Sequence, residues 1–438
     1  MRFLSLTLLA SAVAGFVVNQ GSTCTLYPES LTHGGLPVDD VPSIHEAFNI
    51  CGINGTVIFS NGTFNIATIL NTTNLLNVDV ILRGVLQFTD NIPYWRSHSW
   101  SVIFQNQVTA WLFGGTNVTL RGDGGWIDGH GQSWYTFSNN TANLPGRPIT
   151  ITVYNSTNVL IDSLTIIQPQ FWAVFVWKSQ NVSLTNYYTN ATTNNAKYTT
   201  FNTDGFDSWN SDTILIENAT ITTNDDCVAA KGNTTNLYAK NVTCYGSTGM
   251  TIGSIGQYPA TPDYVLNVTF EDVLCVGGLD CAYVKTWQSA ALDVTTNGDA
   301  GGGGGGLVKN VTFRNFEVQD VGLPIQVTQC IYATASGQGC NTSNLALEDI
   351  SWVNFTGTSK YNIAASMYCA SNHPCPGIMF SDVNIDSVNA TAGLPLYNTT
   401  LQTEVYQCDN IIGQNTSGIP CNHVAPAFFS QAVTKNVQ

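Results

Sequence analysis

The feature of this sequence that most limits its fold is a short motif that returns along most of the chain. An Asn or Asp is followed by a few β-branched or apolar residues, and successive copies are mostly about twenty to forty residues apart, the spacing of solenoid repeats. Copies begin at Asn117, Asn158, Asn181, Asp212, Asn236, Asn267 and Asn310. Helical heptads are absent, and runs rich in Val, Ile and Thr favour strands. The sequence therefore predicts an all-β fold, a right-handed parallel β-helix with Asn-rich turns.

Two segments interrupt this pattern. Residues 37–51 predict a short helix with Ser43 as its N-cap, which would cover the open N-terminal end of the solenoid. Residues 301–306 are six consecutive glycines, which predict a flexible turn between coils because no phosphate-loop GK[ST] ending follows. No second domain is indicated, so residues 20–438 are expected to form a single β-helix domain.

The N-terminal segment indicates export of the protein. Met1 and Arg2 precede an apolar run that ends in Ala12-Val13-Ala14, so residues 1–14 are interpreted as a secretory signal peptide, with cleavage there or a few residues later. The run is too short to span a membrane, and no later stretch is long enough. We therefore expect a soluble, secreted, extracellular protein without a membrane partner.

Twelve cysteines in a secreted chain predict disulfide bonds. A zinc site is the alternative, but no couple has tight C-x₂-C spacing together with a pair of histidines. Spacing alone does not give the connectivity, and short local loops are the simplest expectation. The close couples are Cys24 and Cys51, Cys227 and Cys244, Cys275 and Cys281, Cys330 and Cys340, Cys369 and Cys375, and Cys408 and Cys421.

The chain is also rich in Asn-X-Ser/Thr sequons. In a secreted protein several of them are expected to carry N-glycans, while others serve the turns of a β-rich fold. The candidate glycosylation sites are Asn117, Asn155, Asn181, Asn218, Asn241, Asn267, Asn310, Asn354 and Asn389.

Residues 201–231 hold the candidate active site. Asp204 lies in Asn-Thr-Asp, and Asp225 and Asp226 lie in Asn-Asp-Asp-Cys one repeat interval later. If each cluster meets a strand and the chain returns one coil later, the carboxyl groups come together, because stacked parallel strands are roughly 4.8 Å apart. Asp225 and Asp226 can face one cleft only if the chain bends there, which Cys227 and the small residues after it permit.

Close carboxyl groups predict acid–base chemistry. Like charges at short range cannot all ionise, so at least one pKa is expected to rise, which gives a proton donor beside ionised bases. Glycoside hydrolysis needs both, since an acid protonates the leaving oxygen while a carboxylate activates water. An inverting enzyme separates the two groups by roughly 6.5–9.5 Å. Asp207 and Asp212, in the same stretch, are interpreted as turn residues.

Four segments carry a resemblance to a known family. They are residues 126–134 (WIDGHGQSW), 202–207 (NTDGFD), 224–227 (NDDC) and 246–256. Taken in this order, they resemble glycoside hydrolase family 28, the polygalacturonases and their pectin-degrading relatives. The resemblance covers most of the chain and implies a right-handed parallel β-helix and inverting hydrolysis. It also implies a disulfide from Cys227 to Cys244, because the family bridges this cysteine to one about a coil later.

The resemblance implies roles for individual residues. Asp225 matches the general acid of the family, and Asp204 and Asp226 match the carboxylates that hold and activate water. Asn202, which opens the first acidic cluster, is grouped with the substrate-binding residues. His130, in Asp-Gly-His-Gly, is interpreted as a turn residue rather than a catalytic group.

Two positions depart from the family pattern. Thr248 stands in place of a Gly-His-Gly histidine, and Tyr283 stands in place of the arginine of Arg-Ile-Lys, whose lysine is retained as Lys285. Threonine has no titratable group, and tyrosine offers one hydroxyl and a stacking face where arginine would bind a carboxylate with two bonds. Because the chain carries a formal charge of −15, an anionic substrate needs a local cation. Lys285 is the candidate contact to a uronate, and Thr248 and Tyr283 are the other expected binding residues.

The predicted function is an exo-acting galacturonidase that removes terminal galacturonic acid from polygalacturonan or oligogalacturonides. The two departures, Gln257-Tyr258 and the long segment around the glycine run resemble exo-acting fungal members, and such loops would block one end of a groove. We expect a monomer that acts on pectic polysaccharide without a cofactor or a metal. The acidic charge argues against a nucleic-acid partner.

Three alternatives remain open. A rhamnogalacturonan-directed hydrolase of the same family is the first, since those relatives also lack the histidine. A pectate lyase would share the solenoid, but it would use Ca²⁺ and an Arg or Lys base to eliminate rather than hydrolyse. A β-helix that binds pectin without cutting it is the third, because two family positions are changed, although the intact acidic trio argues against it.

Overall fold

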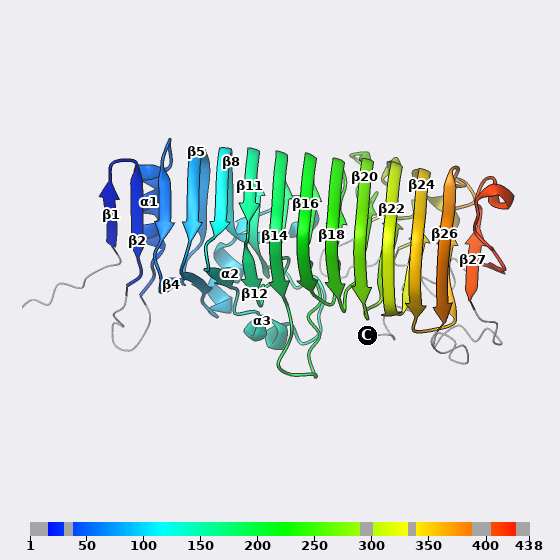
Figure 1. Cartoon of the computed structure of the whole chain (residues 1–438), viewed down its shortest axis with the longest axis horizontal. Helices are drawn as coiled ribbons and strands as arrows, with labels where there is room; N and C mark the ends of the chain where they lie inside the picture. The colour runs from blue at the N-terminus through cyan, green and yellow to red at the C-terminus, as the bar shows by residue number, and fades with distance from the viewer. Residues whose placement is uncertain (1–15, 30–37, 290–300, 332–338, 388–403, 426–438) are drawn as a thin grey trace, which may run out of the picture.

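The chain forms an elongated right-handed parallel β-helix, as predicted (Figure 1). The computed structural model describes residues 16–29, 38–289, 301–331, 339–387 and 404–425. Within these ranges every strand pairing is parallel except those of β1 with β2 and of β7 with β8. No helix in the described ranges is long and apolar enough to cross a membrane.

Each coil contributes one long or divided strand and one short strand. The long strands lie side by side along the molecule in Figure 1. They are β5 (Leu70–Leu82), β8 (Val108–Gly122), β11 (Thr157–Asp162), β12 (Thr165–Ile167), β14 (Gln180–Asn190), β16 (Ser211–Thr222), β18 (Thr234–Tyr245), β20 (Asp263–Val276), β22 (Gly305–Val321), β24 (Asn344–Ser359) and β26 (Ile378–Ser387).

The short strands form a second parallel face, here called the short-strand face. They are β10 (Pro148–Tyr154), β13 (Val174–Trp177), β15 (Phe206–Trp209), β17 (Val228–Ala230), β19 (Met250–Ile255), β21 (Asp280–Thr286), β23 (Leu323–Thr328), β25 (Ile363–Tyr368) and β27 (Val405–Asp409). Each pairs in parallel with the next in this order.

The remaining elements lie mainly in the N-terminal third. They are β1 (Phe16–Gln20), β2 (Thr23–Tyr27), α1 (Val41–Cys51), β3 (Thr56–Phe59), β4 (Thr63–Ile66), β6 (Val85–Phe88), α2 (Ile92–His98), β7 (Trp100–Ser101), β9 (Trp126–Asp128), α3 (Gly131–Ser138) and, at the far end, β28 (His423–Val424). Helix α1 packs on β1, β2, β3 and β5 at the N-terminal end, so the predicted capping helix is confirmed.

The predicted N-cap of this helix is wrong. The helix begins at Val41 with Asp40 as its N-cap, and Ser43 is buried inside its first turn. Pro42 explains the earlier start, because its fixed φ suits a first helical turn and its missing N–H is not needed there. The Asp40 carboxylate instead accepts hydrogen bonds from the backbone N–H groups of Glu29 and Asn65, which ties the helix start to β4.

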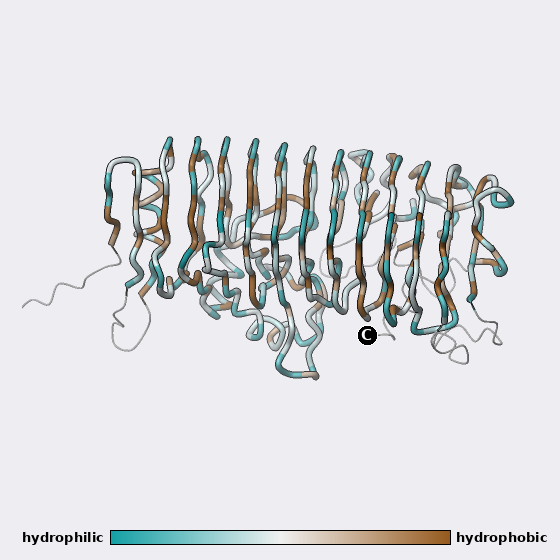
Figure 2. Tube along the Cα trace, viewed as in Figure 1, coloured by the Kyte–Doolittle hydropathy of each residue, from teal (hydrophilic) through white to brown (hydrophobic). Residues whose placement is uncertain are grey.

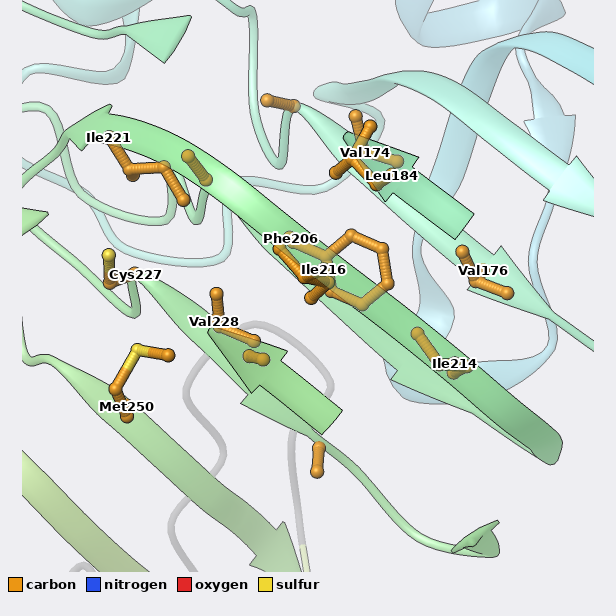
Figure 3. Close-up of a cluster of buried hydrophobic side chains, with 14 of the residues drawn as sticks. Val174, Val176, Leu184, Phe206, Ile214, Ile216, Ile221, Cys227, Val228 and Met250 are labelled. Carbon is orange, nitrogen blue, oxygen red and sulfur yellow. The ribbon is translucent and has the colours of Figure 1, made fainter. Parts of the chain in front are cut away.

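The core is built from the same position on successive coils. Phe206, Val228 and Met250 are register partners on β15, β17 and β19, and they point into a common apolar interior with Ile216 and Ile221 of β16 (Figure 3). Along the strands, hydrophobic stretches alternate with hydrophilic ones (Figure 2). Since neighbouring strand residues face opposite sides, the residues next to these core positions face outward from the coil.

Asparagine side chains stack along the turns of successive coils. Asn158 donates from Nδ2 to Oδ1 of Asn117 at 2.9 Å, and Asn181 donates to Asn158 at 2.8 Å. All three have a positive φ, a left-handed conformation that asparagine tolerates better than most residues. The Asn motif of the sequence is therefore the corner of each coil, and the stacked amides satisfy one another.

Most of the predicted glycosylation asparagines belong to such stacks. Seven of them donate from Nδ2 to an asparagine of a neighbouring coil: Asn117, Asn181, Asn218, Asn241, Asn267, Asn310 and Asn354. Asn155 lies at an exposed corner, and Asn389 lies outside the described residues. Glycan occupancy at all nine sites stays a prediction.

All six close cysteine couples are disulfide-bonded, including Cys227 with Cys244 and Cys369 with Cys375. The loops are short because each bond joins neighbouring segments of the solenoid. The glycine run, by contrast, is more ordered than predicted. Its last two residues open β22, and Gly302, Gly303 and Gly304 donate backbone hydrogen bonds to the carbonyl groups of Gln257, Gln288 and Gly256.

The ladder can be tested with Asn218→Ala in protein made without glycans in a bacterial periplasm. Asn218 donates to Asn186 and accepts from Asn241, so the change removes two ladder hydrogen bonds. Asn155→Ala is the matched control, because Asn155 is also exposed and has a positive φ but makes no such bond. We expect Asn218→Ala to lower the free energy of unfolding by about 1–2 kcal/mol more than the control does. Equal losses in urea titrations would contradict a stabilising ladder.

Candidate active site

The register of the short-strand face brings the predicted carboxylates together. Asp204, Asp226 and Thr248 each lie two residues before a core residue of β15, β17 or β19, and those core residues are direct partners. One oxygen each of Asp204, Asp225 and Asp226 lies within 4.8 Å of the others. The predicted meeting of the three carboxyl groups is therefore present in the structure.

The chain bends where Asp225 and Asp226 share one side, as predicted. The backbone N–H of Asp225 donates to Thr223 Oγ1 at 3.1 Å, and the N–H of Asp226 donates to Asp225 Oδ1 at 2.9 Å. Thr248 closes the turn by donating its N–H to the Asp225 carbonyl at 2.9 Å. Cys227 follows the bend and is anchored in the core through its disulfide.

Asp226 is the carboxylate that the protein holds ionised. Lys285 Nζ lies 2.9 Å from its Oδ1 and 2.8 Å from its Oδ2, and Thr251 Oγ1 donates to Oδ1 at 2.9 Å. Thr248 Oγ1 donates to the same oxygen. Burial works to raise the pKa of Asp226, but the charges of Lys285 and Lys231 and these hydrogen bonds outweigh it and lower that pKa.

Asp225 has the opposite character. It is only partly buried, and its Oδ2 accepts from the backbone N–H and the Nδ2 of Asn202 at 3.1 and 3.3 Å. Burial and the charge of Asp226 raise its pKa, and they prevail over the lowering influence of Lys285. A reachable carboxyl group with a raised pKa therefore stands beside one with a lowered pKa.

Asp204 is buried with Asp207 and Lys231. Lys231 Nζ lies 2.9 Å from Asp207 Oδ1 and 3.9 Å from Asp204 Oδ2. Burial raises the pKa of Asp207 to about 7, against the lowering effect of Lys231. Burial and the nearby charges of Asp225 and Asp207 also raise the pKa of Asp204.

The prediction that Asp207 is a turn residue is therefore wrong. It lies inside β15 and is fully buried. The sequence pattern misled because aspartate is common in turns, whereas the buried ammonium of Lys231 is what makes a strand position tolerable for this carboxylate. His130 does occupy a turn, with a positive φ just before α3.

The structure also places the predicted substrate-binding residues. Lys285 and Thr248 contact Asp226, and Asn202 contacts Asp225. Tyr283 is nearly buried on β21, with Lys285 Nζ 5.2 Å from its ring centroid. All four lie at the acidic cluster, and their contact with a substrate stays a prediction.

Several residues of the site were not singled out from the sequence. Thr251 binds Asp226, and Lys231 binds Asp207. Arg147 is buried near the cluster and donates to the Phe201 carbonyl at 2.8 Å. It interacts electrostatically with Asp204 and Asp225. One signal was available for Lys231: it is a lysine directly after an apolar run in a chain with only 14 Lys and Arg residues.

The three carboxylates are also the group in the described residues whose spacing suits a metal ion. Lys285 already contacts both oxygens of Asp226, so the protein itself supplies a positive charge there. What the arrangement offers chemically is a proton donor, Asp225, within reach of an ionised base, Asp226. This pairing is what the hydrolysis of a glycosidic bond requires.

Comparison with known proteins gives the family. The model of glycosyl hydrolases family 28 matches residues 63–403, and the chain belongs to this family. It is 36% identical to a putative galacturan 1,4-alpha-galacturonidase A of Aspergillus niger, over 96% of this chain and 97% of that protein. It is 32% identical to an alpha-L-rhamnosidase of Aspergillus niger, over 89% of both. Among solved structures, it resembles an endo-xylogalacturonan hydrolase from Aspergillus tubingensis, with a TM-score of 0.77, 25% identity and coverage of 92% and 99%.

The raised carboxyl pKa values predict that stability falls as the pH rises from about 4 to 7. Burial raises the pKa of Asp40 to about 6 and that of Asp207 to about 7, above the value of roughly 3.9 in an unfolded chain. In this window the folded protein holds protons that the unfolded chain has released, so unfolding becomes easier with increasing pH. We expect a loss of at least about 2 kcal/mol.

Chemical denaturation at several pH values measures this dependence. Asp207→Asn removes one of the two groups, so the slope between pH 5 and 7 should become shallower in that variant. A stability that rises steadily over the same range would contradict the burial of protonated carboxyl groups.

Proposed function

We propose that this protein is a secreted exo-acting glycosidase that removes terminal galacturonic acid from polygalacturonan and oligogalacturonides by inverting hydrolysis of alpha-1,4 bonds. The observation that carries the proposal is that the pKa values of two neighbouring carboxyl groups, Asp225 and Asp226, are shifted in opposite directions. Asp225 is partly exposed and has a raised pKa, whereas the pKa of Asp226 is lowered by the charge of Lys285 and its hydrogen bonds. Hydrolysis of a glycosidic bond needs one group of each kind.

In the proposed reaction, Asp225 gives its proton to the glycosidic oxygen as the bond to the sugar breaks. Asp204 and Asp226 hold a water, and Asp226 accepts its proton while the water oxygen attacks the anomeric carbon. Asp204 Oδ1 supports this role, because it is buried and has no hydrogen-bond partner among the described residues. Asn202 keeps Asp225 in place through its two contacts to Oδ2.

The spacing of the carboxylates bears on stereochemistry. Their nearest oxygens lie within 4.8 Å, closer than the roughly 6.5–9.5 Å between acid and base in most inverting glycosidases. The family resemblance implies inversion. Inversion requires an attacking water, and a water bound by Asp204 and Asp226 next to Asp225 would be that nucleophile. The anomer of the first product therefore has to be measured directly.

Exo action is supported by an aromatic cluster that lies over the short-strand face on the N-terminal side of the carboxylates. Over β10, β13 and β15 lies an outer aromatic cluster, separate from the main core. It consists of Val102, Phe104, Ile149, Phe171, Trp172, Phe175 and Trp177, with Tyr154, Trp209 and Tyr258 packed against it. A polymer lying along the coils would meet this cluster on one side of Asp225, so only a chain end fits against the carboxylates.

The cluster is held in place from two sides. Phe104 packs on Trp209 with ring centroids 4.8 Å apart, and the next residue, Gln105, donates its N–H to the Tyr258 hydroxyl at 3.0 Å. Gln105 Nε2 also donates to Gln257 Oε1 at 2.9 Å. Gly302 in turn donates to the Gln257 carbonyl, so the ordered glycine run helps to hold Gln257, and through it the outer aromatic cluster, in place.

A uronate substrate is supported by Lys285 and by the relatives. Two of the three N–H bonds of the Lys285 ammonium point to Asp226, which leaves one for a substrate carboxylate. A similar protein is named a galacturan 1,4-alpha-galacturonidase. We further infer that residues 1–14 are removed on export and that residues 20–438 act as one extracellular, monomeric domain on pectic polysaccharide.

A rhamnogalacturonan-directed hydrolase is the second candidate. Two observations favour it: a similar protein is named an alpha-L-rhamnosidase, and Thr248 and Tyr283 replace the family's histidine and arginine. Tyr283 offers a single hydroxyl where an arginine would bind a carboxylate with two bonds. A neutral sugar has no carboxylate, so it would need less positive charge at this position than a uronate does.

Asp225→Asn tests the assignment of the acid. The amide keeps the size of the side chain but has no acidic proton, so turnover should fall by at least about 100-fold. Sugar binding and the thermal unfolding temperature should change little. Near-normal turnover would remove Asp225 from the role of acid, and a chain that no longer folds would show that the residue is structural.

The substrate is tested by following trigalacturonate, polygalacturonate and de-esterified rhamnogalacturonan with proton NMR during the first minutes. We expect free galacturonic acid from the two galacturonans, with the β anomer appearing first and little loss of polymer viscosity. Products from rhamnogalacturonan alone would favour the second candidate. An unsaturated, calcium-dependent product would indicate a lyase, the α anomer first would indicate retention, and no product from any polymer would indicate a binding protein.

A further inference from the structure

Lys231 is buried under the candidate active site, and the proposed reaction does not yet use it. Its side chain is 4% exposed, and it follows β17 directly. Its ammonium lies against Asp207 at 2.9 Å, within 3.9 Å of Asp204, and 4.6 Å from the ring centroid of Trp172. An isolated buried ammonium is costly, so these partners are what make the position stable.

The strand register places Lys231 in the same outward row as Lys285. Ala230 pairs with Ile252, so Lys231 lies beside Gly253, and Gly253 pairs with Lys285 one coil further. A Cβ on Gly253 would come within 2.7 Å of Lys285 Cγ and within 2.2 Å of its carbonyl oxygen. The glycine therefore leaves room for the backbone and side chain of Lys285, which serves a different carboxylate from Lys231.

The charges around Lys231 favour a shared proton between two of its neighbours. Lys285 pairs with Asp226, so Lys231 is the ammonium that faces Asp204 and Asp207. Asp204 and Asp207 both lie against the single ammonium of Lys231, at 3.9 and 2.9 Å, and two buried carboxyl groups beside one positive charge are most stable when one of them carries a proton. One negative charge is then left on the pair, and Lys231 balances it.

We propose that Lys231 is a positioning residue that holds Asp204 and Asp207 as a carboxyl pair with one shared proton. In this state Oδ2 of Asp204 lies toward Lys231, and Oδ1 is left for the attacking water. Oδ1 has no hydrogen-bond partner among the described residues, and a carboxyl oxygen of Asp204 lies within 4.8 Å of oxygens of Asp225 and Asp226. The water contact rests on the proposed function, whereas the charge balance of the pair does not.

Every charged group that faces Lys231 enters this balance. Asp207, Asp204 and Asp226 favour its charged form, and Lys285 opposes it. Behind the pair, Arg147 also feels the charge of Asp204. Removing the ammonium leaves the negative charge of the pair uncompensated in a buried place, so the pair would take up a second proton.

Lys231→Met tests this arrangement, with Lys231→Arg as the control that keeps the charge. In the Met variant, the acid limb of the pH profile of kcat/KM should move up by at least about one pH unit. At pH 4.5, kcat should fall by about tenfold or more, and KM should change less. The Arg variant should keep the wild-type acid limb, whatever its rate.

Asp207→Asn provides a second variant in case Lys231→Met does not fold. It leaves Lys231 to Asp204 alone, so the acid limb should move to lower pH, opposite to the Met variant. A merely structural role for Lys231 would lower the rate equally at all pH values and move neither limb. Unshifted limbs in both variants would overturn the proposal.

Carbon-13 NMR of protein labelled at the Asp carboxyl carbons follows the titration of Asp204 and Asp207 without substrate. Asp204→Asn assigns the signals, and the Met variant should raise the pH at which the pair becomes doubly protonated. This titration decides the proposal even if the enzyme cuts no pectic polymer. Conversely, wild-type hydrolysis with an unchanged titration in Lys231→Met would overturn the proposal and leave the proposed function standing.

Discussion

The structure depends on one constraint: equivalent residues of successive coils stack directly on each other. Parallel strands are spaced at roughly 4.8 Å, so whatever chemistry a position carries is repeated at contact distance on the next coil. At inward positions this builds a continuous apolar column, as with Phe206, Val228 and Met250. At the corners it builds hydrogen-bonded asparagine stacks. Just before the short strands it puts Asp204 next to Asp226, where the same stacking would be repulsive without compensation.

Charge compensation is what makes that acidic column stable, and the same compensation gives it chemistry. Lys285 and Lys231 come from the same outward row of the short-strand face, and each serves a different carboxylate. Burial raises the pKa of the carboxyl groups that these lysines do not fully compensate, namely those of Asp204, Asp207 and Asp225. The proposed reaction uses this imbalance, with Asp225 as the proton donor and Asp226 as the base, because burial makes every uncompensated charge costly.

The proposed exo action depends on the segments that surround the carboxylates. The coils themselves give an extended face along which a polymer could lie in either direction. Here the outer aromatic cluster packs against Tyr258, and Gln105 hydrogen-bonds to both Gln257 and Tyr258. These segments lie outside the regular coils, so they can change the reach of the site without disturbing the stacking that builds it.

The sequence by itself determined the solenoid, the six local disulfides and the three carboxylates, because each depends on residue type and a regular spacing along the chain. It could not place Ser43 or Asp207 correctly, since helix starts and buried strand positions are decided by contacts with other segments. Only the tertiary structure decided that Lys231 faces Asp207 and that seven of the nine candidate glycosylation asparagines form ladders. Both results depend on which residues meet across coils, and that register comes from packing the whole core rather than from any local pattern.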